Sequence, residues 1–102
     1  MNSDKITALL GFCRKAGKLV AGTSKVTDLI QSGKDCLVML ASDISEKTEK
    51  ELSFKAKNKR AVIIRLDILT SDVAKATGTT AGVVATADEG FYKAILQGGK
   101  DL

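Results

Sequence analysis

Hydrophobic residues recur along the chain with two different spacings, and the change of spacing outlines its elements. In residues 4–16 the apolar positions follow i, i+3, i+4, i+7, which is the spacing of one face of an α-helix. Residues 36–41 form a continuous apolar run, and residues 61–66 are interrupted only by Arg65. Runs of this length are typical of strands that are covered on both faces.

The same spacings predict helices and strands in alternation along the whole chain. The expected helices are residues 4–16, 24–32, 45–57, 72–77 and 88–97, and the expected strands are 19–21, 36–41, 61–66 and 82–86. Alternating strands and helices with apolar strands predict a three-layer α/β/α sandwich. We expect a mainly parallel or mixed sheet of about four strands, within a single domain that spans residues 1–102.

Small polar residues and glycines indicate where the helices begin and end. Thr23, Ser45 and Asp88 each precede an expected helix and are residue types that cap helix N-termini. Gly33 and Gly78 follow expected helices, at the position where glycine most often ends one. After the last helix, the pair Gly98-Gly99 is expected to play the same part.

The composition excludes most common designs of enzyme active site. The 102 residues include no histidine, so there is no Ser-His or Cys-His nucleophile pair and no His-ligated metal. Glycine-rich phosphate loops are also missing, because five residues rather than four separate Gly11 from Gly17 and Leu19 stands where Ser or Thr would hold magnesium. We therefore expect a non-enzymatic protein without metal, cofactor or small-molecule substrate, and an enzyme with a less common type of site is the remaining alternative.

The two cysteines indicate a reducing compartment. Cys13 and Cys36 both lie within apolar stretches and lack the spacing of a metal-binding pair, which favours buried free thiols over a disulfide. No apolar run approaches the roughly 20 residues that span a bilayer. A cytoplasmic protein with no membrane association is the expectation.

Charge is distributed unevenly, and two basic segments stand out. The chain has 16 Lys and Arg against 12 Asp and Glu, a net charge of +4. Residues 1–34 and 47–65 are basic, whereas residues 35–46 and 66–102 are acidic. If folding joins the basic segments they form a face for an anionic partner. The alternative is two solvated helical faces with no partner.

One turn in the N-terminal third combines features that suit an anion. A short strand passes into a helix at Gly22, and the first residues of a helix present free backbone N–H groups. Small hydroxyls and cations lie in and just before this turn: Arg14, Lys15, Lys18, Thr23, Ser24 and Lys25. The alternative is an ordinary capped helix.

A second turn, residues 78–82, contains only small side chains. A flat partner surface could approach its backbone, or its glycines could simply serve a helix end and a tight connection. In a parallel or mixed sheet the turns at 22–25 and 78–82 can fall at the same end, where they would form a single site.

Five segments follow one another in a recognisable order: 22–27 with Gly33, 37–43, 62–64, 72–78 and 82–85. Together they resemble the ribosomal protein L-seven-Ae/L-thirty-e superfamily, and its bacterial YlxQ-like branch most of all. The resemblance covers roughly residues 5–97.

That resemblance implies an α/β/α fold and binding of kink-turn RNA or another structured RNA such as ribosomal RNA. In the family, the start of the second helix meets the guanines of tandem sheared G·A pairs, and the loop before the last strand covers a flipped-out nucleotide. The residues at the first place are Gly22, Thr23, Ser24 and Lys25, and those at the second are Thr79, Thr80 and Ala81.

The chain departs from the family pattern at the positions that read bases. Strong members of the family have Asn-Glu where this chain has Ser24-Lys25, and Lys where it has Asp28. Asn and Glu read base edges, whereas Lys25 would attract phosphate without sequence information. These departures predict RNA binding with weaker specificity. The alternative is a protein–protein interaction module on the same fold, with the lysine-rich third helix as a docking face.

Overall fold

The computed structural model describes residues 3–98, which form the alternation of helices and strands expected from the sequence. The helices are α1 (Ser3–Lys15), α2 (Thr23–Gln31), α3 (Glu46–Lys55), α4 (Thr70–Thr77) and α5 (Glu89–Gly98). The strands are β1 (Val20–Ala21), β2 (Cys36–Leu40), β3 (Ala61–Arg65) and β4 (Val83–Thr86). Every boundary lies within two residues of its expected place, and Gly99 lies outside the described residues.

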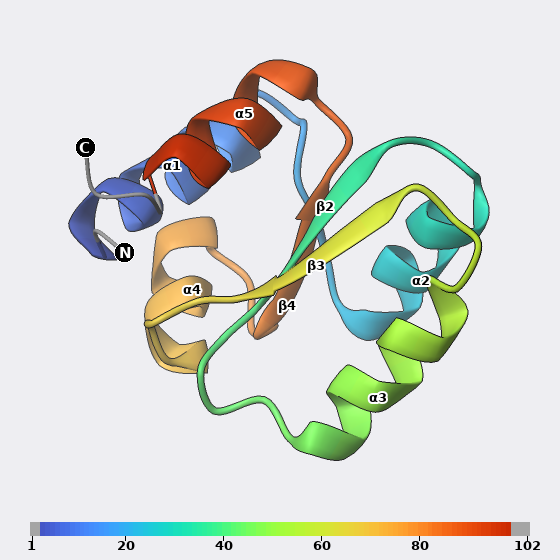
Figure 1. The fold of residues 1–102 in the computed structure, drawn as a ribbon. Coiled ribbons are helices and arrows are strands. Elements are labelled where there is room, and N and C mark those ends of the chain that lie inside the picture. Colours follow the sequence, from blue (N-terminus) through green and yellow to red (C-terminus); the bar gives the residue numbers. More distant parts are fainter. Residues whose placement is uncertain (1–2, 99–102) are drawn as a thin grey trace.

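The four strands form one mixed sheet in the order β1-β4-β2-β3 (Figure 1). Only β2 and β3 run parallel, with Val38 opposite Ile63, whereas β4 is antiparallel to both of its neighbours. Leu40, the last residue of β2, lies opposite both Arg65 and Val83. The chain therefore leaves β3 and enters β4 at the same end of the sheet, and this return makes the sheet mixed rather than mainly parallel.

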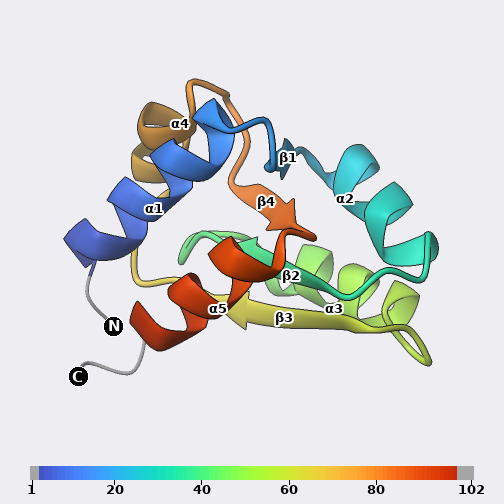
Figure 2. The same cartoon turned by 90° about the horizontal axis from the view of Figure 1, so that it is seen from above.

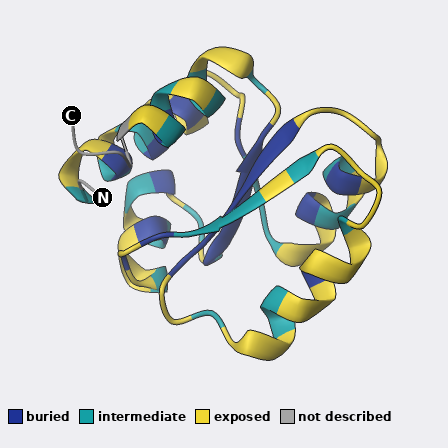
Figure 3. Ribbon diagram, viewed as in Figure 1, coloured by how far each residue is buried: buried dark blue, intermediate teal, exposed yellow. Residues whose placement is uncertain are grey.

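Helices cover both faces of the sheet, so the expected three-layer sandwich is confirmed (Figure 2). On one face, α1, α4 and α5 pack against side chains such as Leu37 and Met39; on the other, α2 and α3 pack against Val38 and Leu40. Successive residues of β2 thus point to opposite layers, as the pleat requires. All five residues of β2 are buried, whereas the outer surface of α3 is exposed (Figure 3).

Two of the three expected N-caps are confirmed. The Ser45 hydroxyl accepts a hydrogen bond from the Thr48 N–H, and the Asp88 carboxylate accepts one from the Phe91 N–H. The prediction for Thr23 is wrong, because α2 begins at Thr23 and its N-cap is Gly22, with no side-chain bond. Gly78 ends α4 in the left-handed conformation, as expected.

Both cysteines are free and buried, in agreement with the expectation from their apolar surroundings. Burial raises the pKa of the Cys13 thiol and also that of Cys36. Among residues 3–98, no helix is long and apolar enough to cross a membrane.

Candidate nucleic-acid interface

The start of α2 is built on a backbone conformation that favours glycine. Gly22 has φ 98° and ψ 145°, in a region that residues with a side chain rarely enter. A Cβ atom added there would meet nothing within 4 Å, so the backbone of this turn faces open space. Thr23, Ser24 and Lys25 follow it and are all exposed. The first N–H groups of α2 are consequently available to a partner.

The loop between α4 and β4 is held in shape by its own hydroxyl groups. Thr79 Oγ1 lies 2.9 Å from Thr77 Oγ1 and accepts a hydrogen bond from the Ala81 N–H at 3.3 Å. Thr80 is exposed beside them, while Ala81 is half-buried. These contacts leave the small side chains of the loop at the surface, where a flat group can come close to the backbone.

The structure brings these two segments together at one end of the sheet. The Gly22 N–H donates to the Val83 carbonyl oxygen at 2.9 Å, which joins the start of α2 to the end of the loop. The Ala41 N–H donates to the Gly82 carbonyl oxygen at 2.8 Å and fixes the same end to β2. The expectation that the two turns share one end of the sheet is confirmed.

Arg14 is also tied to this end of the molecule. Its Nε donates to the carbonyl oxygen of Thr77 at 3.1 Å, one residue before the loop begins at Gly78. Lys15 is its neighbour at the end of α1 and lines a groove between α1 and α4, together with Lys75. Both predicted cations of α1 therefore flank the loop rather than the start of α2.

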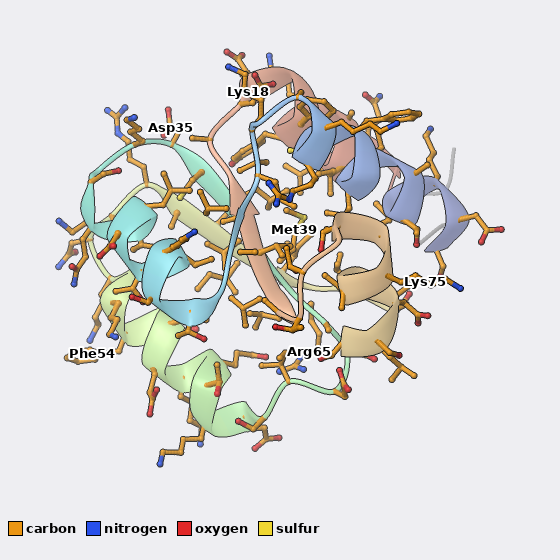
Figure 4. The ribbon with its side chains drawn as sticks, turned by 180° about the vertical axis from the view of Figure 1, so that it is seen from behind. Lys18, Asp35, Met39, Phe54, Arg65 and Lys75 are labelled. Atoms are coloured by element: carbon orange, nitrogen blue, oxygen red, sulfur yellow. The ribbon has the colours of Figure 1, made fainter. Side chains whose placement is uncertain are left out.

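Lys18 lies apart from the other predicted residues. Its carbonyl oxygen accepts a hydrogen bond from Thr86 Oγ1 at 2.7 Å, at the opposite end of β4 from Val83 (Figure 4). At about 3.3 Å per residue, some 10 Å of strand separates it from Gly22. Asp88 and Glu89, the latter paired with Lys93, line the same surface concavity as Lys18, and their negative charge weakens the attraction of Lys18 for an anion.

Two residues that the sequence did not single out also border this end of the sandwich. Lys75 comes from α4, and Phe12 of α1 is 60% exposed in the same groove. Phe12 falls outside the helical stripe formed by Ile6, Leu10 and Cys13, so its exposure was readable from the spacing. The position of Lys75 could not be predicted from the sequence, because it depends on how α4 packs against α1.

A carboxylate holds the start of α4 behind the loop. Asp43 Oδ1 accepts hydrogen bonds from the backbone N–H and the hydroxyl of Thr70, at 2.8 and 2.7 Å. These bonds hold the pKa of Asp43 below its ordinary value. Within residues 3–98 there is no group of three or more His, Cys, Asp or Glu side chains that could hold a metal ion.

Comparison with known proteins places the chain among RNA-binding and ribosomal relatives. The model of the ribosomal protein L7Ae/L30e/S12e/Gadd45 family matches residues 4–96. The RNA-binding protein YlxQ of Enterococcus faecium is 28% identical over 92 residues, which are 90% of this chain and 88% of that protein.

Solved structures show the same fold. A protein of unknown function from Bacillus halodurans superposes with a TM-score of 0.83 at 26% identity, covering 95% of this chain and 98% of its own. The 15.5kD RNA binding protein of Giardia lamblia superposes with a TM-score of 0.70 at 16% identity, covering 98% and 89%, and shows the fold alone. With the family model matched over nearly the whole length, this chain belongs to the ribosomal protein L7Ae/L30e/S12e/Gadd45 family.

Proposed function

We propose that this protein is a non-enzymatic RNA-binding protein that recognises structured RNA through the start of α2 and the loop before β4. One observation carries the proposal: the hydrogen bond between Gly22 and Val83 sets free helix N–H groups beside a loop of small side chains. Membership of the family and the name of the Enterococcus relative support it.

The two segments would meet different parts of the RNA. The N–H groups at the start of α2, helped by the helix dipole, suit a phosphate or an acceptor atom on a guanine. Lys25 adds a mobile positive charge, and Ser24 a hydroxyl that can donate or accept. Thr79, Thr80 and Ala81 would cover an unstacked nucleotide, since none of these side chains is large enough to keep it away.

The proposed RNA is a kink-turn or a kink-turn-like element of ribosomal RNA. Ser24 and Lys25 replace base-reading side chains of the family, so backbone groups and phosphate contacts would provide most of the affinity. With about four phosphate contacts, the slope of log K against log salt concentration should be about −3 to −4. Arg14 and Lys15 are proposed for phosphates beside the loop, and Lys18 for a phosphate beyond the far end of the strands.

A gel-shift or fluorescence anisotropy titration tests the proposal directly. The probes are a kink-turn RNA and the same RNA with its tandem G·A pairs replaced by Watson–Crick pairs, each titrated at several salt concentrations. Tighter binding of the kink-turn supports the full proposal. Equal binding of the two would disprove kink-turn recognition, and a failure of both to bind at low salt would disprove RNA binding.

One observation favours a second candidate, a protein–protein interaction module. Phe54 on α3 is 74% exposed, on a helix that carries three lysines and three glutamates: Lys47, Lys50, Lys55, Glu46, Glu49 and Glu51. An exposed aromatic ring with charged side chains of both signs around it would suit a protein surface. If neither RNA binds while Phe54→Ala changes an interaction with a protein partner, this second function is the correct one.

A further inference from the structure

The groove between α1 and α4 has the form of a shallow channel with one aromatic wall. Ala8, Gly11, Phe12 and Lys15 follow i, i+3, i+4, i+7 on α1, so they lie on one face of that helix. A Cβ atom on Gly11 would lie 3.4 Å from the carbonyl oxygen of Ala76, which shows how closely α4 approaches. Small residues thus form the floor, and Phe12 stands at its edge.

Two lysines line the same groove as the exposed ring. Lys15 and Lys75 line the groove from α1 and α4 respectively. Within the part of the chain that the structure describes, neither ammonium group is held by a hydrogen bond or an ion pair. The Nε of Arg14 donates a hydrogen bond to the carbonyl oxygen of Thr77. This bond fixes the orientation of the guanidinium group and so of its remaining N–H donors.

The carboxylates of this helix pair lie toward its other end. Asp4 and Asp72 line a neighbouring concavity with Ser3 and Thr7 near the start of α1, and Lys75 borders both this concavity and the groove. Among the described residues, the lining of the groove itself includes Arg14, Lys15 and Lys75 and no carboxylate, and it reaches Gly78, the first residue of the loop. Cations in the last turn of a helix also complement its dipole, which would account for Lys15 and Lys75 but not for an exposed phenylalanine between them.

We propose that this groove is a second RNA subsite, which binds an unpaired nucleotide next to the structured element. The base stacks on the ring of Phe12, and its flanking phosphates lie near Lys15 and Lys75. An aromatic platform within a positive groove is the usual way to hold single-stranded RNA without reading its sequence. The inference rests on the proposed function, because the strand reaches the groove from the RNA bound at the loop.

Binding assays with extended and blunt RNAs distinguish this subsite from the main interface. One probe is a blunt kink-turn RNA, and the others carry five unpaired nucleotides on its 5′ or its 3′ end. We expect one extended probe to bind wild-type protein more tightly than the blunt RNA. Stacking contributes about 1–3 kcal/mol per base, so Phe12→Ala should lower the affinity for that probe by about 5- to 150-fold. The affinity for the blunt RNA should stay within about twofold of the wild-type value.

A fluorescent variant gives a second readout. The chain contains no tryptophan, so Phe12→Trp creates a single reporter that preserves stacking. Its fluorescence should be quenched by the extended RNA and not by the blunt one. Phe54→Trp is the matched control, because Phe54 is at least as exposed as Phe12 but lies on α3, which packs on the opposite face of the sheet.

The outcomes distinguish the subsite from the interface. If the extended and blunt RNAs bind equally well and Phe12→Ala changes neither, the subsite does not exist while the proposed function stands. Equal quenching of both tryptophan variants would also overturn it, since stacking would then occur at any exposed ring. If wild-type protein binds no probe at low salt, the proposed function fails and the subsite with it.

Discussion

The N–H of Gly22 donates a hydrogen bond to the carbonyl oxygen of Val83, with 2.9 Å between the two atoms, across 61 positions of sequence. This bond continues the ladder of β1 and β4, in which Ala21 pairs with Val84. It joins the turns at 22–25 and 78–82, which form the proposed interface only together. A substitution that changes the backbone conformation of either turn should therefore affect both the RNA affinity and the stability.

Gly22→Ala should lower the free energy of unfolding by about 1–3 kcal/mol, because alanine is strained at φ 98° and ψ 145°. Open space around the added Cβ excludes a clash as the cause. Urea denaturation measures the loss, and Thr23→Ala is the control. Since the Thr23 hydroxyl makes no hydrogen bond within the described part of the chain, a loss above about 0.5 kcal/mol in that control would contradict the account of this turn.

Lys25→Ala should weaken binding to kink-turn and duplex RNA alike. Removing one phosphate contact reduces the salt slope by about one, so the deficit shrinks as the salt concentration rises. Anisotropy titrations between 50 and 200 mM salt measure it. Lys59→Ala removes an equal charge from the turn after α3 and should leave the salt slope unchanged. If Lys59→Ala reduced the slope as much as Lys25→Ala, the effect would come from net charge and not from a contact at Lys25.

Gly82→Ala should destabilise the fold by about 1–3 kcal/mol through overpacking. The added Cβ would collide with the Thr70 side chain and lie 2.9 Å from Cδ1 of Ile44. The double variant with Thr70→Ala removes the more severe clash and should recover part of the loss. Thermal denaturation of the four proteins of this cycle gives the coupling energy, and strictly additive losses would argue against the clash.

The two thiols should be slow to react with a thiol reagent in the native protein. Cys13 and Cys36 are buried, and burial raises the pKa of each, so little thiolate is available near neutral pH. Both should react promptly in denaturant. Because the folded protein holds these protons more tightly than the unfolded chain, stability should fall as the pH rises above the ordinary thiol value of 9.0. Rapid native labelling at pH 7 would contradict their burial.

The local pattern of the sequence was enough to place the helices and strands. The helical spacing and the continuous apolar runs depend on neighbouring residues alone, and so do the helix ends at Ser45, Gly78 and Asp88. Thr23 failed as a cap because the residue before it, Gly22, takes a conformation set by pairing with β4. The missing histidines likewise restricted the chemistry without any reference to the fold.

The order of the strands, and which residues lie together on each surface, depended on contacts between residues that are distant in the sequence. The antiparallel return into β4 brings the loop to Gly22 and carries Lys18 to the opposite end of the same strands. Close packing of α4 on α1 sets Lys75 beside Phe12, although 63 positions separate them. Periodicity shows which face of an element is apolar. Which elements meet is decided by how the whole chain buries those faces together.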